Sequence, residues 1–215
     1  MVNLKAVTFA GATLALFAIL GTGLVAFTQQ QTKDLIAANE RLALLRKLEV
    51  LVPPETVDND MVQDGVRVHR ADLLGDNSTT IYRGRRNGEP VAAVFTTVVP
   101  NGYAGPINLL VAVKADGTLM GVRVVSHKET PGLGDKIEEE KSDWVLGFKG
   151  KSLADPAEGQ WKVKRDGGAF DQFTGATITP RSLVQAVKNT LIYVREQGDR
   201  FYRIPARTDN LQEKP

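Results

Sequence analysis

The sequence predicts an α+β fold, with a single N-terminal transmembrane helix followed by a domain that holds an antiparallel sheet and flanking helices. Three patterns predict it. No charged residue lies between Lys5 and Lys33. From Thr80 onward, apolar residues alternate with polar ones or form short continuous runs, as strands do. Near the C-terminus, apolar residues recur at helical spacing from Leu183 to Val194.

The composition excludes several classes of chemistry. The 215 residues include no Cys, which rules out disulfides, Cys-ligated iron–sulfur clusters, thiolate nucleophiles and most structural zinc sites. His69 and His127 are the only histidines, so we expect no metal centre. Lys and Arg number 27 against 25 Asp and Glu, a net charge of +2 without a long basic run, so nucleic acid is not an expected partner.

The uncharged stretch predicts a transmembrane helix over residues 6–28, preceded by a cytoplasmic segment at residues 1–5. A helix rises about 1.5 Å per residue, so roughly 20 apolar residues cross a hydrocarbon core of about 30 Å. Two alternatives are a cleaved signal peptide, with Ala-x-Ala spacing at Ala10 and Ala12, and a buried core helix. The apolar stretch exceeds the usual length of a signal-peptide core, and core helices rarely lack charge for so long.

The charges beside this helix predict its orientation. The free amino terminus and Lys5 lie on one side, whereas Lys33 and Asp34 nearly cancel on the other. Because cytoplasmic flanks carry the excess of positive charge, we expect a cytoplasmic start and an extracytoplasmic body.

After the transmembrane segment, residues 29–54 predict an amphipathic juxtamembrane helix. We expect its apolar stripe to pack on the following domain or on a partner subunit. The apolar residues that recur at helical spacing are Leu35, Ala38, Leu42, Leu45 and Val52. The helix should stop at Pro53 and Pro54, because proline lacks an amide donor and its ring clashes with the preceding turn. Residues 55–79 are polar and predict loops around a short strand at 66–70.

The folded domain is expected over residues 55–200, and its centre predicts an antiparallel meander. Asn87-Gly88 and Asp116-Gly117 fall between apolar runs, where turns that need positive φ favour such pairs. The strands are predicted within residues 81–99, 107–113 and 119–129.

Between the meander and the last helix, the pattern is less regular. Residues 134–148 have the charge density of a short exposed helix, followed by Trp144 and Phe148 turned inward. Residues 160–167 predict one more strand.

The last helix is predicted to begin with Thr179 as its N-cap and Pro180 at its first helical position. It should end near Gly198, and its apolar residues on one face are Leu183, Val187, Leu191 and Val194. Residues 201–215 predict a polar C-terminal tail.

Common catalytic motifs are missing from the sequence. Gly150-Lys151-Ser152 resembles the end of a phosphate-binding loop, but that motif needs a glycine where Val145 stands. No G-x-G-x-x-G follows a strand, and no G-x-S-x-G occurs. The usual signals for nucleotide hydrolysis, dinucleotide binding and serine hydrolysis are therefore absent.

Two other stretches are candidates for ligand binding. Residues 127–136, HKETPGLGDK, place proline and glycine directly after a strand, although a plain connecting loop would look the same. Residues 166–180, DGGAFDQFTGATITP, place TGAT directly before the last helix. Gly175 allows close approach of a ligand, and the helix N-terminus favours a phosphate carried by Thr177. The alternative is that these hydroxyl residues only cap the helix.

The run from Asp171 to Thr177, DQFTGAT, resembles the flavinylation motif D-x-x-[ST]-G-A-T of proteins that carry FMN in phosphoester linkage to threonine. The chain as a whole resembles the G subunits of the Rnf (or Rsx) ion-translocating electron transport complexes, from the membrane helix to about Tyr193. The likeness includes GYAGPI at 102–107, HKETPGLGDKI from His127, SDW at 142–144 and DGGAFDQFTGATITPR at 166–181. Each motif alone is weak, but their joint occurrence in this order is specific.

This resemblance implies that Thr177 is the acceptor, as FMN phosphoryl threonine. It implies that Asp171, Thr174, Gly175 and Ala176 complete a motif read by a separate flavin transferase, which delivers FMN from FAD. Thr179, placed two residues later, is expected to cap the helix and bond the phosphate. The loop expected to border the flavin consists of Glu129, Thr130, Pro131, Gly132 and Leu133, continuing to Gly134.

The resemblance thus predicts a flavoprotein subunit that relays electrons within a membrane complex coupling electron transfer to ion translocation, with no catalytic residue of its own. It implies other subunits of that complex as partners and a place in the bacterial inner membrane, with the main domain in the periplasm. Two alternatives remain open: the C subunit of the sodium-translocating NADH:quinone oxidoreductase, and a flavin-free anchored scaffold in which TGAT is a helix cap.

Overall fold

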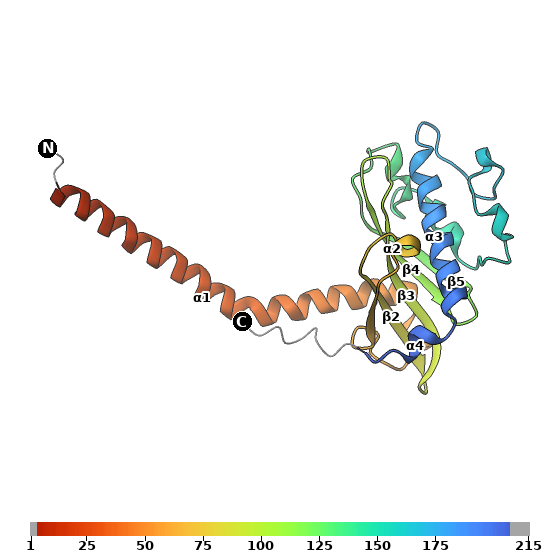
Figure 1. The fold of residues 1–215 in the computed structure, drawn as a ribbon, viewed down its shortest axis with the longest axis horizontal. Helices are drawn as coiled ribbons and strands as arrows, with labels where there is room; N and C mark the ends of the chain where they lie inside the picture. The colour runs from red at the N-terminus through yellow and green to blue at the C-terminus, as the bar shows by residue number, and fades with distance from the viewer. Residues whose placement is uncertain (1–3, 207–215) are drawn as a thin grey trace. The chain divides into compact units, whose positions relative to one another are not determined.

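The computed structural model describes residues 4–206, so the predictions made for residues 1–3 and 207–215 lie outside the described residues. The chain divides into two compact units, residues 1–44 and residues 45–215. The described residues of the first unit, 4–44, are part of a long helix, and the second unit contains the folded domain (Figure 1).

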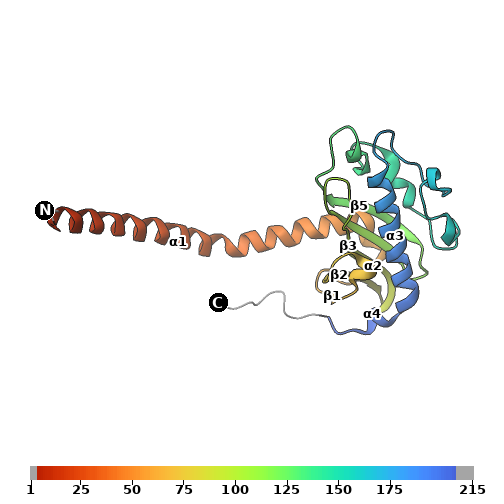
Figure 2. The same cartoon turned by 45° about the horizontal axis from the view of Figure 1, so that its top comes forward.

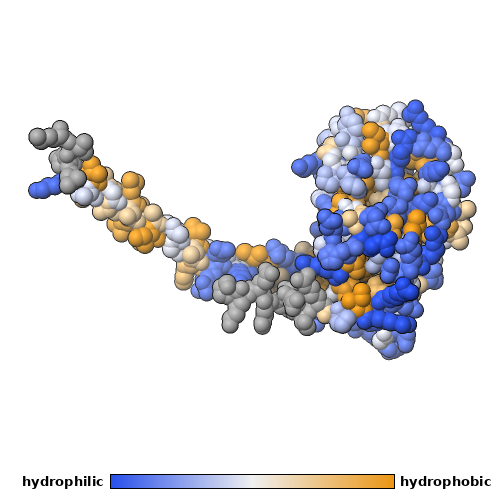
Figure 3. All heavy atoms as spheres, viewed as in Figure 1, coloured by the Kyte–Doolittle hydropathy of each residue, from blue (hydrophilic) through white to orange (hydrophobic). Residues whose placement is uncertain are grey.

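Helix α1 (Leu4–Leu51) joins the predicted transmembrane and juxtamembrane segments without interruption. Among the described residues, it is the one helix long and apolar enough to cross a membrane. Phe9 is 76% exposed and Leu24 is 69% exposed, and Figure 3 shows hydrophobic surface along the first part of the helix. Apolar side chains without protein neighbours favour a nonpolar solvent, and this stretch is long enough for a bilayer to provide one.

The C-terminal end of α1 belongs to the folded domain. Leu48 and Leu51 are buried there, whereas Leu35 and Leu42 of the predicted apolar stripe are exposed. The stripe is therefore buried only at its end. The helix stops at Leu51, as the two prolines predict, and a 3-10 turn, η1 (Pro54–Thr56), follows.

The domain is built on one five-stranded antiparallel sheet with strand order β1-β2-β3-β4-β5, which confirms the predicted meander. The turn between β2 and β3 has positive φ at Asn87 (52°) and Gly88 (81°), as an Asn-Gly hairpin turn requires. Gly117 has a φ of 84° in the next predicted turn. The strands are β1 (Gly65–Val68), β2 (Thr79–Arg86), β3 (Glu89–Val99), β4 (Ile107–Lys114) and β5 (Leu119–Ser126).

Helix α3 (Ile178–Gln197) covers one face of the sheet (Figure 2). Thr97 in β3 and Thr190 in α3 are fully buried and share a hydrogen bond of 3.0 Å. Phe95 packs edge to face against Tyr193, with 5.9 Å between ring centroids. The residues predicted for the inner face of the helix are all buried, namely Leu183, Val187, Leu191 and Val194.

The opposite face of the sheet is also covered, which explains the continuous apolar runs in the sequence. Phe95 lies in the core under α3, whereas its neighbour Val94 is fully buried outside that core. Consecutive strand residues point to opposite faces, so both faces exclude water here. A Cβ on Gly121 would lie 2.9 Å from Leu51 Cδ2, so the end of α1 packs closely on β5.

The C-terminal segment packs into the domain further than the sequence predicts. Helix α3 ends before Gly198, as predicted, and a short helix, α4 (Arg200–Arg203), follows. Phe201 and Tyr202 are buried, although the composition of residues 201–215 predicts a polar tail. The prediction of a polar tail is wrong for these two residues, because adjacent aromatic side chains bury a large area that an average over the whole segment hides.

Two predictions for the irregular part of the domain are wrong. Residues 138–141 are bends and turns rather than part of an exposed helix. Residues 160–167 are turns and 3-10 helix rather than a strand, because the chain turns back at Gly167 and only Val163 pairs, with Phe170. The remaining short helices are α2 (Ala71–Leu74), η2 (Gly134–Ile137), η3 (Asp143–Phe148), η4 (Glu158–Gln160) and η5 (Lys164–Asp166).

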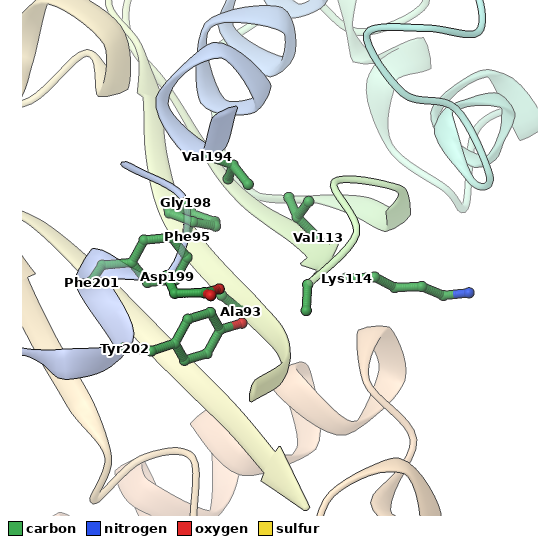
Figure 4. A pocket seen from close by; sticks show the side chains of 10 residues that line it. Ala93, Phe95, Val113, Lys114, Val194, Gly198, Asp199, Phe201 and Tyr202 are labelled. Carbon is green, nitrogen blue, oxygen red and sulfur yellow. The ribbon is translucent and has the colours of Figure 1, made fainter. Parts of the chain in front are cut away.

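A small cavity remains where the end of α3 meets the sheet (Figure 4). Phe95, Val113 and Val194 line it together with Phe201 and Tyr202, and its volume is about 30 Å³. That volume is far below the roughly 300–1,000 Å³ of typical small-molecule pockets.

Candidate functional site

The TGAT segment forms a tight, exposed turn. Phe173 and Ala176 pair across it, and Ala176 N donates to Phe173 O at 3.2 Å. Thr174 and Gly175 lie between them and are exposed, and Gly175 has a φ of 82°. A type II turn needs positive φ at its third residue, which glycine adopts without strain. The turn thus presents Thr174 and Gly175 to solvent.

Thr177 follows this turn at the N-terminus of α3. It occupies the N-cap position, but its backbone is helical (φ −84°, ψ −28°) and its side chain makes no capping hydrogen bond. An N-cap threonine ordinarily has an extended backbone and accepts a hydrogen bond from an amide two or three residues later. The side chain is partly exposed. A plain capping role therefore does not describe Thr177.

Thr179 is not the N-cap that the sequence predicts. Helix α3 begins at Ile178, so Thr179 and Pro180 lie inside its first turn, where proline is still tolerated. The Thr179 hydroxyl donates to Glu129 Oε2 at 2.6 Å, and both residues are buried. The prediction is wrong because a partner 50 residues away in the sequence binds this hydroxyl.

The loop that begins at Glu129 lies against the TGAT turn. Thr130 O accepts hydrogen bonds from Leu133 N and Gly134 N, both at 3.1 Å, which closes the loop. A Cβ on Gly175 would lie 3.3 Å from Leu133 Cδ2, so loop and turn are in contact. Two stretches singled out separately in the sequence therefore form one surface. The exposed residues of the loop are Thr130, Pro131, Gly132 and Leu133.

An aromatic cluster anchors the motif to the domain. Trp144 Nε1 donates to Asp171 O at 2.8 Å, and its ring packs edge-on against Phe173 at 5.1 Å between centroids. Phe148 is fully buried, as predicted, and stacks on Phe170 at 4.9 Å. These rings hold the motif from inside, which leaves Asp171 exposed with the turn that follows it. The cluster consists of Trp144, Phe148, Trp161, Phe170 and Phe173.

Ion pairs flank the motif on the surface. Arg181 donates two hydrogen bonds to Asp166, at 2.6 and 2.8 Å, and Lys164 Nζ lies 2.6 Å from Asp171 Oδ1. Hydrogen bonding to the Arg181 guanidinium lowers the pKa of the Asp166 carboxyl. A lowered pKa means that the pair is intact above the ordinary Asp pKa and weakens as the pH falls through the lowered value.

The structure brings three further residues to the site, Ala104, Trp144 and Arg181, to which the sequence motifs assign no role. Ala104 N donates to Glu129 Oε1 at 3.1 Å, and Trp144 and Arg181 make the contacts described above. The sequence did carry a signal for them, because all three lie within the stretches of likeness GYAGPI, SDW and DGGAFDQFTGATITPR. Their roles depend on contacts between distant segments.

The described part of the chain holds no group of three or more His, Cys, Asp or Glu residues placed to bind a metal. His127 makes two hydrogen bonds within the protein. Its Nε2 lies 2.7 Å from Glu138 Oε1, and its Nδ1 accepts from Glu129 N at 2.9 Å. Because Nδ1 is an acceptor, Nε2 carries the ring proton and donates to Glu138.

Gly168→Ala should destabilise the segment that leads into the motif. A Cβ at Gly168 would lie 1.9 Å from Lys162 O and 2.3 Å from Lys162 C. A rotamer change cannot relieve a clash with backbone, so we expect a loss of about 1–3 kcal/mol, as for overpacked interiors. The thermal unfolding midpoint of the full chain in detergent measures it. Gly159→Ala is the matched control, because nothing lies within 4 Å of its Cβ position. Equal midpoints for the two variants would refute this prediction.

Two family models match the chain, one over the folded domain and one over the N-terminal helix. The family model for FMN-binding domains matches residues 102–192, a range that includes β4, β5, the loop at Glu129, the TGAT turn and most of α3. A second family model, the RnfG N-terminal region, matches residues 1–51, which end where α1 ends. The chain therefore combines an FMN-binding domain with this N-terminal helix.

Relatives of similar length identify the family. The chain is 46% identical over 207 residues to the G subunit of the ion-translocating oxidoreductase complex from Shewanella amazonensis, covering 96% of each chain. It is 50% identical over 193 residues to the G subunit from Pseudoalteromonas atlantica, covering 89% of this chain and 90% of the relative. The Pseudomonas aeruginosa G subunit is 50% identical over 189 residues, covering 87% and 88%. The chain belongs to the family of G subunits of ion-translocating oxidoreductase complexes.

Proposed function

We propose that this chain is a membrane-anchored electron-transfer subunit of an ion-translocating oxidoreductase complex and that it carries FMN joined through its phosphate to Thr177. The observation that carries the proposal is the Thr177 side chain, which stands at the N-terminus of α3 without a capping hydrogen bond. The match of residues 102–192 to FMN-binding domains supports the cofactor. The relatives, named as G subunits of such complexes, support the assembly.

The residues around Thr177 fit a phosphate. Helix α3 has 20 residues, which is long enough for a helix dipole with its positive end at the N-terminus. The first amides of the helix have no partner within the helix, so they can also bind an anion there. The amides of Ile178 and Thr179 lie in the first turn, where no helical carbonyl precedes them. Gly175 has no side chain to obstruct the approach. These groups would hold the FMN phosphate.

Exposed apolar side chains lie next to the same point. Leu133 is 41% exposed and contacts the turn at Gly175, and Ile178 is 46% exposed and follows Thr177 directly. Flat aromatic ligands are held mainly by apolar contacts with a few polar groups. Leu133 and Ile178 would therefore contact the isoalloxazine ring.

Attachment needs a separate flavin transferase, because threonine is a poor nucleophile at neutral pH without an activating base. With FAD as donor, the Thr177 oxygen forms a bond to the phosphorus of the FMN half. The pyrophosphate bond of FAD breaks, AMP leaves, and the hydroxyl proton is released. Asp171, Thr174 and Gly175 are exposed, so the enzyme can reach the motif on the folded chain.

Bound FMN supplies the capacity to accept and pass on one or two electrons. The chain supplies position. The phosphoester keeps the cofactor from diffusing away, and α1 keeps the domain at the membrane. Other subunits of the complex supply the electron donor and acceptor, and the domain faces the periplasm.

A denaturing gel tests the covalent cofactor. The full chain, co-expressed with a flavin transferase, should give a fluorescent flavin band near 23.4 kDa, because a phosphoester survives denaturation and a non-covalent complex does not. The same chain produced without the transferase should give a dark band. A band without flavin fluorescence in the presence of the transferase would refute the proposal.

Protease treatment of spheroplasts tests the orientation. We expect external protease to digest the domain, residues 45–206, while a tag placed before α1 stays protected. The positive flank at Lys5 is the physical reason. A cytoplasmic marker protein controls for lysis. Protection of the domain until the membrane is dissolved would put it in the cytoplasm instead.

A further inference from the structure

Glu129 is a buried carboxylate close to the proposed attachment residue. Its side chain is 4% exposed, Oε2 accepts from Thr179 Oγ1 at 2.6 Å, and Oε1 accepts from Ala104 N at 3.1 Å. Thr179 lies two residues after Thr177 in the first turn of α3. One carboxylate therefore connects the loop before β4 to the start of the helix.

Two glycines make the space for this carboxylate. A Cβ on Gly102 would lie 2.8 Å from Glu129 Oε1, and a Cβ on Gly134 would lie 2.5 Å from Glu129 Oε2. Side chains at either position would displace the carboxylate. The pocket for Glu129 is thus built by two separate segments that both lack side chains at the point of contact.

The backbone of Glu129 is held as well. Its N–H donates to His127 Nδ1, and His127 in turn donates to Glu138. The loop that follows carries Leu133 into contact with Gly175 of the turn. Glu129 therefore links three segments around Thr177, namely the loop before β4, the loop after β5 and the first turn of α3.

We propose that Glu129 is a positioning residue for flavin attachment, whose buried carboxylate fixes the Thr177 hydroxyl relative to the TGAT turn. This proposal rests on the proposed role of Thr177. It differs from a direct contact with flavin, which the family resemblance implies for this loop. Both carboxylate oxygens already accept hydrogen bonds within the protein, and the side chain is buried.

Two substitutions separate the link from the charge. In Glu129→Gln, the side-chain oxygen still accepts from Ala104 N, and the amide donates to the Thr179 hydroxyl, which accepts instead. The three-segment link is kept without the charge. Glu129→Ala removes the link, leaves both donors without a partner and opens a void between Gly102 and Gly134.

The experiment follows attachment to the full chain, purified in detergent without flavin and then incubated with the flavin transferase and FAD. For Glu129→Ala we expect the maximal rate to fall roughly 10- to 100-fold with an unchanged KM for FAD, because misplacing a reacting group lowers the rate of the bond-forming step. For Glu129→Gln we expect a maximal rate within about threefold of the wild-type rate, because the hydrogen-bonded link is kept. Thr179→Val keeps the side-chain volume, removes the donor to Oε2, and should also lower the maximal rate.

Thr190→Val is the matched control for stability. Thr190 is buried in the same helix and bonds Thr97 Oγ1 and Ala186 O, both at 3.0 Å. Its loss should lower the unfolding midpoint but leave the attachment rate unchanged. A fall in rate equal to that of Thr179→Val would show that helix stability, not positioning, sets the rate and would overturn the proposal.

The remaining outcomes are also decisive. A wild-type rate in Glu129→Ala and Thr179→Val overturns the positioning role and leaves the Thr177 proposal intact. A Glu129→Gln rate as low as that of Glu129→Ala assigns the effect to charge and overturns the hydrogen-bonded link. If no FMN becomes attached to the wild-type chain, the proposed function itself is wrong.

Discussion

Replacing Thr177 with Ala should remove covalent flavin from the chain completely, because alanine lacks the hydroxyl oxygen that is proposed to carry the phosphate. The denaturing-gel band should lose all flavin fluorescence while the amount of chain stays the same. Mass analysis of peptides from the wild-type protein should place the FMN phosphate on residue 177. The fold should persist, since the Thr177 side chain makes no capping hydrogen bond that alanine would lose.

Thr179→Ala is the control that discriminates between the two neighbouring hydroxyls. The Thr179 side chain is buried and bonds Glu129, so its loss should lower the rate of labelling without removing the site of the label. After long incubation with the transferase, Thr179→Ala should carry flavin and Thr177→Ala should not. The reverse pattern would reassign the acceptor to Thr179.

Arg83→Ala should cause the largest loss of stability, about 3–5 kcal/mol, because it leaves buried partners of a charge without their donor. Arg83 is 1% exposed, and its Nη1 donates to the carbonyls of Phe201 (3.0 Å), Tyr202 (3.1 Å) and Ile204 (2.5 Å). Its Nη2 also bonds the Asp64 carboxylate. Burial lowers the pKa of Arg83, although the Asp64 charge opposes that shift.

The free energy of unfolding of the full chain in detergent, from urea titration, measures this loss. Arg86→Ala is the matched control on the same strand, because Arg86 is exposed and donates to Glu55 O at the surface. We expect a change within about 0.5 kcal/mol for that variant. Limited proteolysis should also cut near Tyr202 in Arg83→Ala. Similar stabilities for the two variants would refute the role assigned to Arg83.

Most of the fold can be predicted from short sequence motifs, in which the residues that matter are near neighbours in the chain. Proline at 53 and 54 stops α1, and Asn87-Gly88 makes the first hairpin turn, because each depends on local backbone chemistry. The predictions fail where partners come from elsewhere. The expected strand at 160–167 is turned back at Gly167 and pairs only through Val163.

The candidate site divides in the same way. The motif itself consists of seven consecutive residues, 171–177, and Thr179 and Pro180 directly after it predict the start of a helix. That the loop after β5 touches this turn does not follow, because the contact between Leu133 and Gly175 spans a long stretch of chain. The hydrogen bond of Trp144 to Asp171 is of the same kind, with partners that lie 27 positions apart in the sequence.

The apolar anchor, the meander and the last helix can be predicted from the sequence, because each depends on residues within a few positions of one another. The resemblance of residues 171–177 to the flavinylation motif identifies Thr177 as the candidate acceptor. Which threonine is buried, and which has a side chain free of capping bonds, depends on contacts between distant segments. Glu129 binds Thr179 and thereby sets the first turn of α3, and Thr177 is left at the helix end with its side chain unused for capping. Folding brings these groups together from segments 50 residues apart, and a contact between such distant residues cannot be predicted from the spacing of near neighbours in the sequence.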